Sequence, residues 1–203
     1  MANPYFIKSY CKIQDGKIAL EGAPYFEAGQ TFGEFSKLAY QHIGLNYPKF
    51  FKMDNMSKLA MLASEPILRN NVDPSQENDV AIVFANKSSS LDTDVRYQKS
   101  IADPENYFPS PAVFVYTLAN ICIGEISIRH QLKSENCFFI FETFDADVMF
   151  AYADSLLRSG KAEQVLAGWI ELYDEHYHAF MYLVAADGTI EHTKQNIEFL
   201  YNR

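Results

Sequence analysis

An apolar segment that turns abruptly into a helix is the first place in this sequence where chemistry is expected. The segment CFFIF (137–141) is followed by the polar stretch ETFD (142–145), and an amphipathic helical pattern then covers residues 145–159. A helix N-terminus offers unpaired N–H groups and partial positive charge, which favour a nucleophile or an oxyanion. The hydroxyl group available at this junction is that of Thr143.

Two interpretations of Thr143 are open. It is either a nucleophile with a base held against it, or a small polar residue that caps the following helix. Asp145 is an equally good N-cap candidate. The carboxylates of Glu142, Asp145 and Asp147 disfavour both an alkoxide and an oxyanion in the same space. The sequence therefore favours capping over nucleophilic catalysis.

The segment LYDEHYHAF (172–180) contains a second candidate cluster. Asp174, His176 and His178 follow one another at a spacing of two residues, so on an extended chain their side chains would share one face. Such a trio is typical of a metal site or an acid–base cluster. A solvated polar strand edge explains the same residues without any ligand.

The remaining histidine and cysteine candidates have structural explanations. His130 lies at the end of an apolar helical segment, where a cation would interact with the last carbonyl groups. Cys11, Cys122 and Cys137 are widely spaced and odd in number, as expected for reduced thiols. No disulfide, metal or cofactor is expected.

These candidates must be positioned by strands and helices that can be predicted from the hydrophobic pattern. Two strands, 5–13 and 17–20, are expected around a turn at Gly16, and helices are expected over 34–43 and 55–68 on one side of a sheet. The run DVAIVFAN (79–86) has the pattern of a central strand covered on both faces.

The second half of the sequence continues the alternation of strands and helices. Residues 87–110 show no apolar period and are interpreted as a long loop, either a lid or an interface arm. The apolar segment 111–132 indicates a buried helix in close contact with another backbone. Strands are expected over 164–172 and 179–185, and the last ten residues are expected to be a short tail. The predicted fold class is α/β.

Composition limits the classes of partner. The 203 residues are 48% hydrophobic and 15% aromatic, which is sufficient for the core of one domain spanning 1–203. With 17 Lys and Arg against 26 Asp and Glu, the formal charge is −9, which argues against binding to nucleic acid or anionic lipid. The sequence shows no secretion signal and no stretch long enough to span a membrane, so a cytoplasmic location is expected.

Several stretches between residues 46 and 172 together resemble the N-terminal half of β-ketoacyl synthases of the thiolase-like superfamily. The segment YTLANICIGEISIRHQLKSEN (116–136) carries most weight, because it is similar to the synthase stretch that precedes the catalytic strand. The residues in matching places are Leu118, Asn120, Gly124, Ser127, Ile128 and Asn136. The resemblance implies a layered thiolase-like half-domain, a mixed β-sheet flanked by helices.

The resemblance also implies that the catalytic machinery is missing. Thr143 occupies the position of the family's catalytic cysteine. The family's two catalytic histidines lie in a second half that this sequence does not contain, so neither role is assigned to a histidine here. No catalytic residue is expected, because a threonine hydroxyl lacks the accessible thiolate that condensation requires.

The function implied is that of a non-catalytic, chain-length-factor-like subunit of fatty-acid, polyketide or aryl-polyene biosynthesis. Such a subunit would pair with a full-length β-ketoacyl synthase, or with itself, and would shape the acyl pocket of an active partner. An acyl carrier protein would dock through that partner. The residues expected at the acyl pocket or dimer interface are Leu118, Asn120, Ile121, Gly124, Phe138, Phe139, Ile140 and Phe141.

Two alternatives remain open. The first is a stand-alone acyl-thioester hydrolase or decarboxylase that uses Thr143 with Glu142 and His176. The second is a homodimeric scaffold or binding module without acyl chemistry. The resemblance to synthases implies that the apolar strand 137–141 pairs with its counterpart across a two-fold axis. Because an open apolar edge is a liability on a monomer, an obligate oligomer is predicted.

Overall fold

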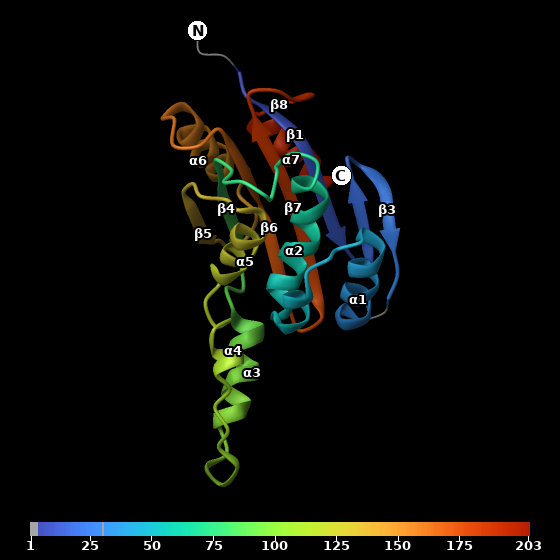
Figure 1. Ribbon diagram of the computed structural model, residues 1–203, viewed down its shortest axis with the longest axis vertical. Helices are drawn as coiled ribbons and strands as arrows, with labels where there is room; N and C mark the ends of the chain where they lie inside the picture. Colours follow the sequence, from blue (N-terminus) through green and yellow to red (C-terminus); the bar gives the residue numbers. More distant parts are fainter. Residues whose placement is uncertain (1–3, 30) are drawn as a thin grey trace.

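A mixed β-sheet forms the centre of the molecule. The computed structural model describes residues 4–29 and 31–203, and within them the strands form one eight-stranded sheet (Figure 1). The strand order is β3-β2-β1-β7-β6-β4-β5, and β8 also pairs with β1. The strands are β1 (Phe6–Gln14), β2 (Lys17–Leu20), β3 (Ala23–Glu27), β4 (Val80–Asn86), β5 (Asn136–Ile140), β6 (Gln164–Tyr173), β7 (His176–Ala185) and β8 (Ile190–Glu191).

The sheet is antiparallel in one part and parallel in the other. The pairs β1–β2, β2–β3, β1–β7 and β6–β7 are antiparallel, whereas β4 runs parallel to both β5 and β6. Every residue of β4 is buried, as predicted for a central strand. Because β4, β5 and β6 are parallel, their carboxyl ends lie at the same end of the sheet, where binding sites of α/β proteins commonly lie.

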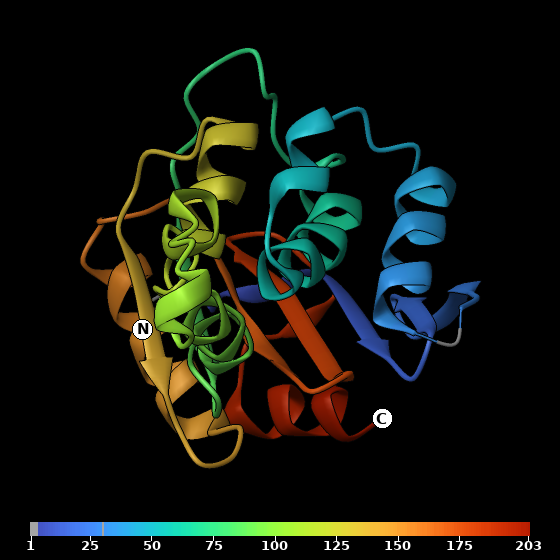
Figure 2. The same ribbon diagram turned by 90° about the horizontal axis from the view of Figure 1, so that it is seen from below.

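Helices cover both faces of the sheet (Figure 2). On one face lie α1 (Phe32–Ile43), α2 (Asn55–Leu68) and α5 (Ile121–His130), with the short 3₁₀ helix η1 (Pro48–Lys52) between α1 and α2. On the other face lie α6 (Ala146–Arg158) and α7 (Lys194–Asn202). The predicted α/β layered fold is confirmed, and the strands and helices predicted before residue 87 agree closely with those observed.

The segment 87–110 is not the continuous loop that was predicted. It contains α3 (Leu91–Ile101) and the short 3₁₀ helix η2 (Pro104–Asn106), and the chain returns through α4 (Pro111–Phe114). Together these elements project from the body as an arm (Figure 1). Within α3 the one buried residue is Thr93, and most residues of the helix are polar, which is why the segment was interpreted as a loop.

The prediction of one buried helix over 111–132 is also wrong. The chain leaves α4 at Phe114, turns through residues 115–120 and begins α5 at Ile121. Phe114, Val115 and Leu118 are exposed although they are apolar. A Cβ atom on Gly124 would meet nothing within 4 Å, so this glycine does not mark a close backbone contact. The prediction failed because these apolar residues lie on the surface of the chain, whereas an apolar sequence pattern alone indicates a buried helix.

The predicted C-terminal tail is the helix α7. Thr193 caps it by accepting a hydrogen bond from the N–H of Asn196 at 3.2 Å. Ile197 and Leu200 are buried in the same cluster as Trp169, on the sheet face shared with α6. Within the described ranges, no helix is both long and apolar enough to cross a membrane.

Candidate functional site

The strand β5 lies at an open edge of the sheet and is apolar. It pairs with β4 in parallel register, from Ile82 opposite Asn136 to Asn86 opposite Ile140, and in the described part of the chain no strand pairs with its other side. The side chain of Ile140 is 52% exposed. The strand has no proline, no charged residue and no bulge in its pairing, so its free N–H and C=O groups are open to another strand.

The opposite edge of the sheet is protected against such pairing. β3 carries Pro24, its register with β2 shifts between Ile18 and Ala19, and an ion pair of 3.3 Å joins Lys17 on β2 to Glu27 at the end of β3. Proline, irregular pairing and charge are the usual means by which edge strands avoid association. The molecule therefore has one blocked edge and one open edge.

The junction between β5 and α6 does not hold a reactive threonine. Asp145 is the N-cap of α6, because its Oδ1 accepts a hydrogen bond from the N–H of Val148 at 2.9 Å. Thr143 is exposed and makes no hydrogen bond to any described residue. The capping role considered for Thr143 thus belongs to Asp145, and no described base is held against the hydroxyl.

Phe144, the residue after Thr143, packs into a cluster of aromatic side chains. Its ring stacks on Tyr201 of α7 with a centroid distance of 4.2 Å and makes edge contacts with Trp169 and Phe180. Lys194 at the start of α7 pairs with Asp147 of α6 at 3.1 Å. The start of α6 is therefore covered by α7, which leaves a shallow hollow of about 240 Å³ next to Thr143.

The predicted trio of Asp174, His176 and His178 does not form. Asp174 has a φ of 48° and lies in the tight turn between β6 and β7, so it does not share a strand face with the two histidines. Burial lowers the pKa of His178 to about 4, and its ring lies 5.0 Å from that of Tyr201. Across the described residues, no group of three His, Cys, Asp or Glu side chains is arranged to hold a metal ion.

Polar residues that the sequence analysis missed fix the root of the arm. The Glu171 carboxylate accepts hydrogen bonds from the N–H groups of Lys87 (2.7 Å) and Ser88 (3.1 Å), where β4 leaves the sheet. Thr93 donates to buried Asp54 at 2.9 Å, which ties α3 to the start of α2. Burial raises the pKa of Asp54. These residues lie far apart in sequence, so no local pattern reveals their pairing.

His130 contacts a buried carboxylate instead of capping carbonyl groups. Its Nε2 lies 3.1 Å from Oε2 of Glu65, and Arg129 donates two hydrogen bonds of 2.9 Å to the same carboxylate. Arg69 adds a bond of 3.0 Å. Burial alone would raise the pKa of Glu65, but the bonds from His130 and Arg129 hold it well below its usual range. This network joins α2 to α5 beneath the open flank.

The eight residues predicted for an interface lie along one flank, and half of them are exposed. β5, α5 and the arm share this side of the molecule (Figures 1 and 2). Exposed on it are Leu118, Asn120, Gly124 and Ile140, whereas Ile121, Phe138, Phe139 and Phe141 are half-buried. Large apolar side chains continue along the arm, where Tyr107, Phe108 and Phe114 are exposed, Phe108 to 72%.

Comparisons with known proteins show the fold. No family model matches the sequence, and no curated protein matches it. A chain of the ishigamide ketosynthase/chain length factor superimposes with a TM-score of 0.66 and 15% identity, covering 90% of this chain and 62% of that one. A chain of the ketosynthase ApeO in complex with its chain length factor ApeC from Xenorhabdus doucetiae gives 0.61 and 15%, covering 98% and 90%.

A third solved structure has the same fold. It is the AntDE:AntF complex, a type II polyketide synthase acyl-carrier protein with its ketosynthase, which superimposes with a TM-score of 0.57 and 15% identity over 98% of this chain. The chain spans about two thirds of the length of the first and third of these structures. The thiolase-like ketosynthase fold predicted from the sequence resemblance is confirmed.

Proposed function

We propose that this chain is a non-catalytic ketosynthase-like subunit, similar in role to a chain length factor. It pairs through β5 with an active β-ketoacyl synthase and shapes the acyl pocket of that partner, in fatty-acid or polyene-type biosynthesis. The observation that carries the proposal is the open, apolar and unprotected edge of β5. This edge belongs to the same flank as α5 and the arm, which also expose apolar side chains.

Pairing at β5 would satisfy the free hydrogen-bonding groups of the strand and would also cover the exposed apolar side chains of this flank. A partner strand hydrogen-bonded to β5 would continue the sheet through two subunits and remove the open edge. The same partner would cover Leu118 and Ile140, which are 60% and 52% exposed in the single chain. A subunit seated there would also meet the arm, whose root is held rigidly by Asp54 and Glu171.

The junction at Thr143 supports a non-catalytic role. Within the described residues the hydroxyl has no base, and Phe144 is packed into the cluster of Trp169, Phe180 and Tyr201. A condensing enzyme requires an activated nucleophile at a position open to its acyl substrate. The acyl chemistry is therefore assigned to the partner.

The composition and the solved structures of similar fold support the assignment of partners. Two of those structures are described as a ketosynthase with a chain length factor, and a third contains an acyl-carrier protein with its ketosynthase. Carrier proteins are acidic, so a chain with a formal charge of −9 is a poor docking surface for one. We assign carrier docking to the partner synthase.

Co-expression with a full-length β-ketoacyl synthase encoded beside this chain tests the proposal. A stoichiometric complex is expected by co-purification and size-exclusion chromatography with light scattering. Ile140→Glu and Leu118→Glu should each weaken that complex about tenfold or more, because each places a charge in an apolar contact. Phe199→Glu is the matched control, since Phe199 is 63% exposed on α7, away from the flank.

The outcomes separate the competing functions. A monomer that ignores the synthase contradicts the proposal. A purified chain that hydrolyses acyl thioesters, and loses this activity in Thr143→Ala, would support the stand-alone hydrolase. No feature of the described site favours the hydrolase, because His176 lines a different hollow from Thr143.

A further inference from the structure

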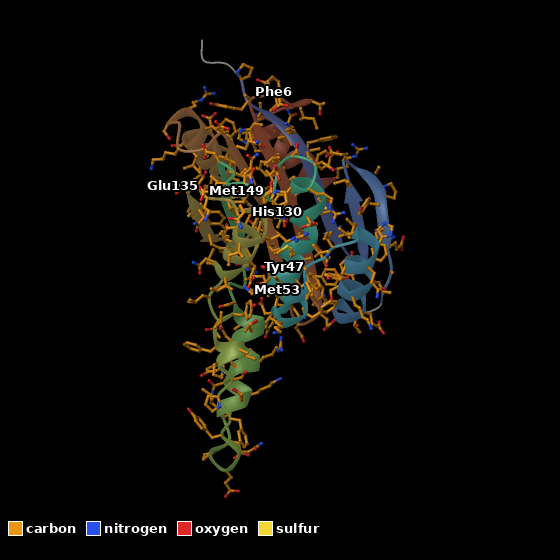
Figure 3. All side chains as sticks on the ribbon, viewed as in Figure 1. Phe6, Tyr47, Met53, His130, Glu135 and Met149 are labelled. Carbon is orange, nitrogen blue, oxygen red and sulfur yellow. The ribbon has the colours of Figure 1, made fainter. Side chains whose placement is uncertain are left out.

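A polar hollow at one end of the sheet has no role in the proposed function. Its volume is about 360 Å³, and its lining comes from the end of β1, the end of β6, the start of β7 and the loop after β4. Figure 3 labels Phe6, the first residue of β1, at the end of the molecule far from the arm. Because the hollow lies where β1 ends, it is at the opposite end of the sheet, where the chain enters the arm.

Strand pairing places three polar side chains of the lining in one row. Gln14 on β1 lies opposite His178 on β7, and His178 lies opposite Glu171 on β6. Side chains directly opposite each other on paired strands lie on the same face of a sheet. That face is the one covered by α7, because the ring of His178 lies 5.0 Å from that of Tyr201. Two strand spacings separate the backbones of Gln14 and Glu171, which is about 10 Å.

Glu171 brings a negative charge that no side-chain cation neutralises. The N–H groups of Lys87 and Ser88 donate to its Oε2, and the hydroxyl group of Ser88 donates to its Oε1. All three donors are neutral, and the carboxylate forms no ion pair with a described residue. A carboxylate offers about four acceptor positions, so Oε1 can accept one more hydrogen bond.

Asp15 brings a second negative charge on the other side of β7. It is exposed in the turn after β1, and it forms no ion pair with any residue that the structure describes. Among those residues, no Lys or Arg side chain lines the hollow. Lys12 is the nearby cation on β1, but its Nζ donates to the carbonyl oxygen of Tyr201 at 2.7 Å. The hollow next to Thr143 differs, because Lys194 lines it and neutralises a carboxylate there.

His178 places a neutral ring between the two carboxylates. Burial lowers its pKa to about 4, so the imidazole is uncharged at neutral pH and one of its nitrogens is an acceptor. Its Nε2 is buried and has no hydrogen-bond partner among the described residues. The lining therefore combines two unneutralised carboxylates with further acceptors, which favours a ligand that carries positive charge and N–H donors.

We infer that this hollow binds a short linear diamine, with one ammonium group at Asp15 and the other at Glu171. Each ammonium group supplies a positive charge and three N–H donors, and the alkyl chain between them crosses the row at His178. A divalent metal ion fits less well, because in the described part of the chain no three His, Cys, Asp or Glu side chains are arranged to hold one. The inference concerns a site away from the β5 edge and does not rest on the proposed function.

Titration with 1,4-diaminobutane tests the site, followed by isothermal calorimetry and by the amide resonances of Gln14 and His178 in NMR spectra. Asp15→Asn removes one charge and should raise the dissociation constant about fivefold. Asp174→Asn is the matched control, because Asp174 is also exposed in a turn, has a φ of 48° against 50° for Asp15, and does not line the hollow. Its dissociation constant should stay within about twofold of wild type.

Two other ligands test the wild-type chain without any substitution. Butylamine, with one ammonium group, should bind about fivefold more weakly than the diamine, and 1,4-butanediol, of the same length without charge, should shift no resonance. Sodium chloride should weaken binding of the diamine by screening. The inference is wrong if the diamine shifts neither resonance, if Asp15→Asn binds it as Asp174→Asn does, or if butylamine binds as tightly as the diamine.

Discussion

The most consequential single residue in the interior is Glu65. It is 1% exposed in α2 and holds together α5 and the end of α1, because Arg129 and His130 contact its carboxylate and Arg69 bonds both Glu65 and the carbonyl of Ile43. A buried carboxylate is tolerated only when such partners satisfy it. The charge network therefore fixes the helical layer beneath the open flank.

Removing this charge should destabilise the fold strongly. Glu65→Gln leaves Arg129 and His130 without their anion and is expected to lower the free energy of unfolding by about 3 kcal/mol. Urea denaturation measures the change. Glu27→Gln, which breaks an exposed ion pair with Lys17, should change it by less than about 1 kcal/mol. Equal effects of the two variants would contradict the assignment.

The pH dependence of the Glu65 contribution follows from the lowered pKa. Because the folded protein holds this pKa below the ordinary value of 4.5, the contribution is complete above that value. It decreases as the pH falls below 4.5, where the unfolded state takes up the proton first. Wild type should therefore lose stability in this range relative to Glu65→Gln.

His192 gives a second prediction at the residue scale. It is 5% exposed, and its ring lies 5.0 Å from that of Phe150. Burial lowers its pKa from 6.5 to about 4, and smaller effects of Asp154 and Arg158 act in opposite directions. Between pH 6.5 and 4 the unfolded state binds the proton and the folded state does not, so wild-type stability falls as the pH falls.

Replacing this histidine should reduce the acid dependence, and the contribution of His178, whose pKa burial also lowers to about 4, should remain. His192→Phe is expected to remove up to about 3 kcal/mol of the stability lost between pH 6.5 and 4. Urea denaturation across that range measures it. Phe199→Ala, at an exposed position without a titratable group, is the control and should retain the wild-type slope. An unchanged slope in His192→Phe would show that the proton is taken up elsewhere.

At the scale of elements, α7 is the helix that closes one face of the sheet. Its residues Ile197 and Leu200 are buried, and Tyr201 stacks on Phe144. Tyr201 also makes an edge contact with Phe180, with a centroid distance of 5.8 Å. Together with α6, this helix covers the second face of the sheet. The free edge of β5 is left uncovered.

Truncation of one α7 side chain should be detectable at the Trp169 indole. Leu200→Ala is expected to lower the free energy of unfolding by about 2–4 kcal/mol, because Leu200 is 4% exposed. Fluorescence reports this directly, since Trp169 is the one tryptophan in the sequence. Phe199→Ala, at a 63% exposed position on the same helix, should change stability by less than about 0.5 kcal/mol.

At the scale of the whole molecule, the arm and the β5 flank expose apolar surface that the core does not need. Phe108 and Leu118 are 72% and 60% exposed. Apolar surface gathered on one side of a chain marks an interaction site, and on an isolated chain it promotes association. Under the proposed function, the blocked β3 edge and the open β5 edge leave one flank for a partner subunit.

Polar substitutions on this surface should raise solubility without changing stability. The double variant Phe108→Ser and Leu118→Ser is expected to keep the free energy of unfolding within about 0.5 kcal/mol for each site, because neither side chain is buried. Turbidity during concentration and the melting temperature measure the two effects. A large loss of stability would show that the arm belongs to the core.

Local patterns predicted most of the regular elements. The strands around Gly16, the fully buried β4, and helices α1, α2 and α6 were all expected, because their apolar residues recur with the period of the element that buries them. Two helices were missed for one reason. Both α3 and α7 are mostly polar and bury few residues, one in α3 and two in α7, so their low apolar content did not indicate a helix packed on the core.

By itself, the sequence determined the α/β class and the resemblance to synthases, because each depends on residue types and local spacing. The placement of Thr143 at the family's nucleophile position stays a prediction from that resemblance. Only the tertiary structure decided that β5 is the open edge, that Asp145 rather than Thr143 caps α6, and that Asp174 lies apart from the histidines. Strand order, backbone dihedral angles and long-range contacts depend on residues distant in the chain, which local patterns do not specify.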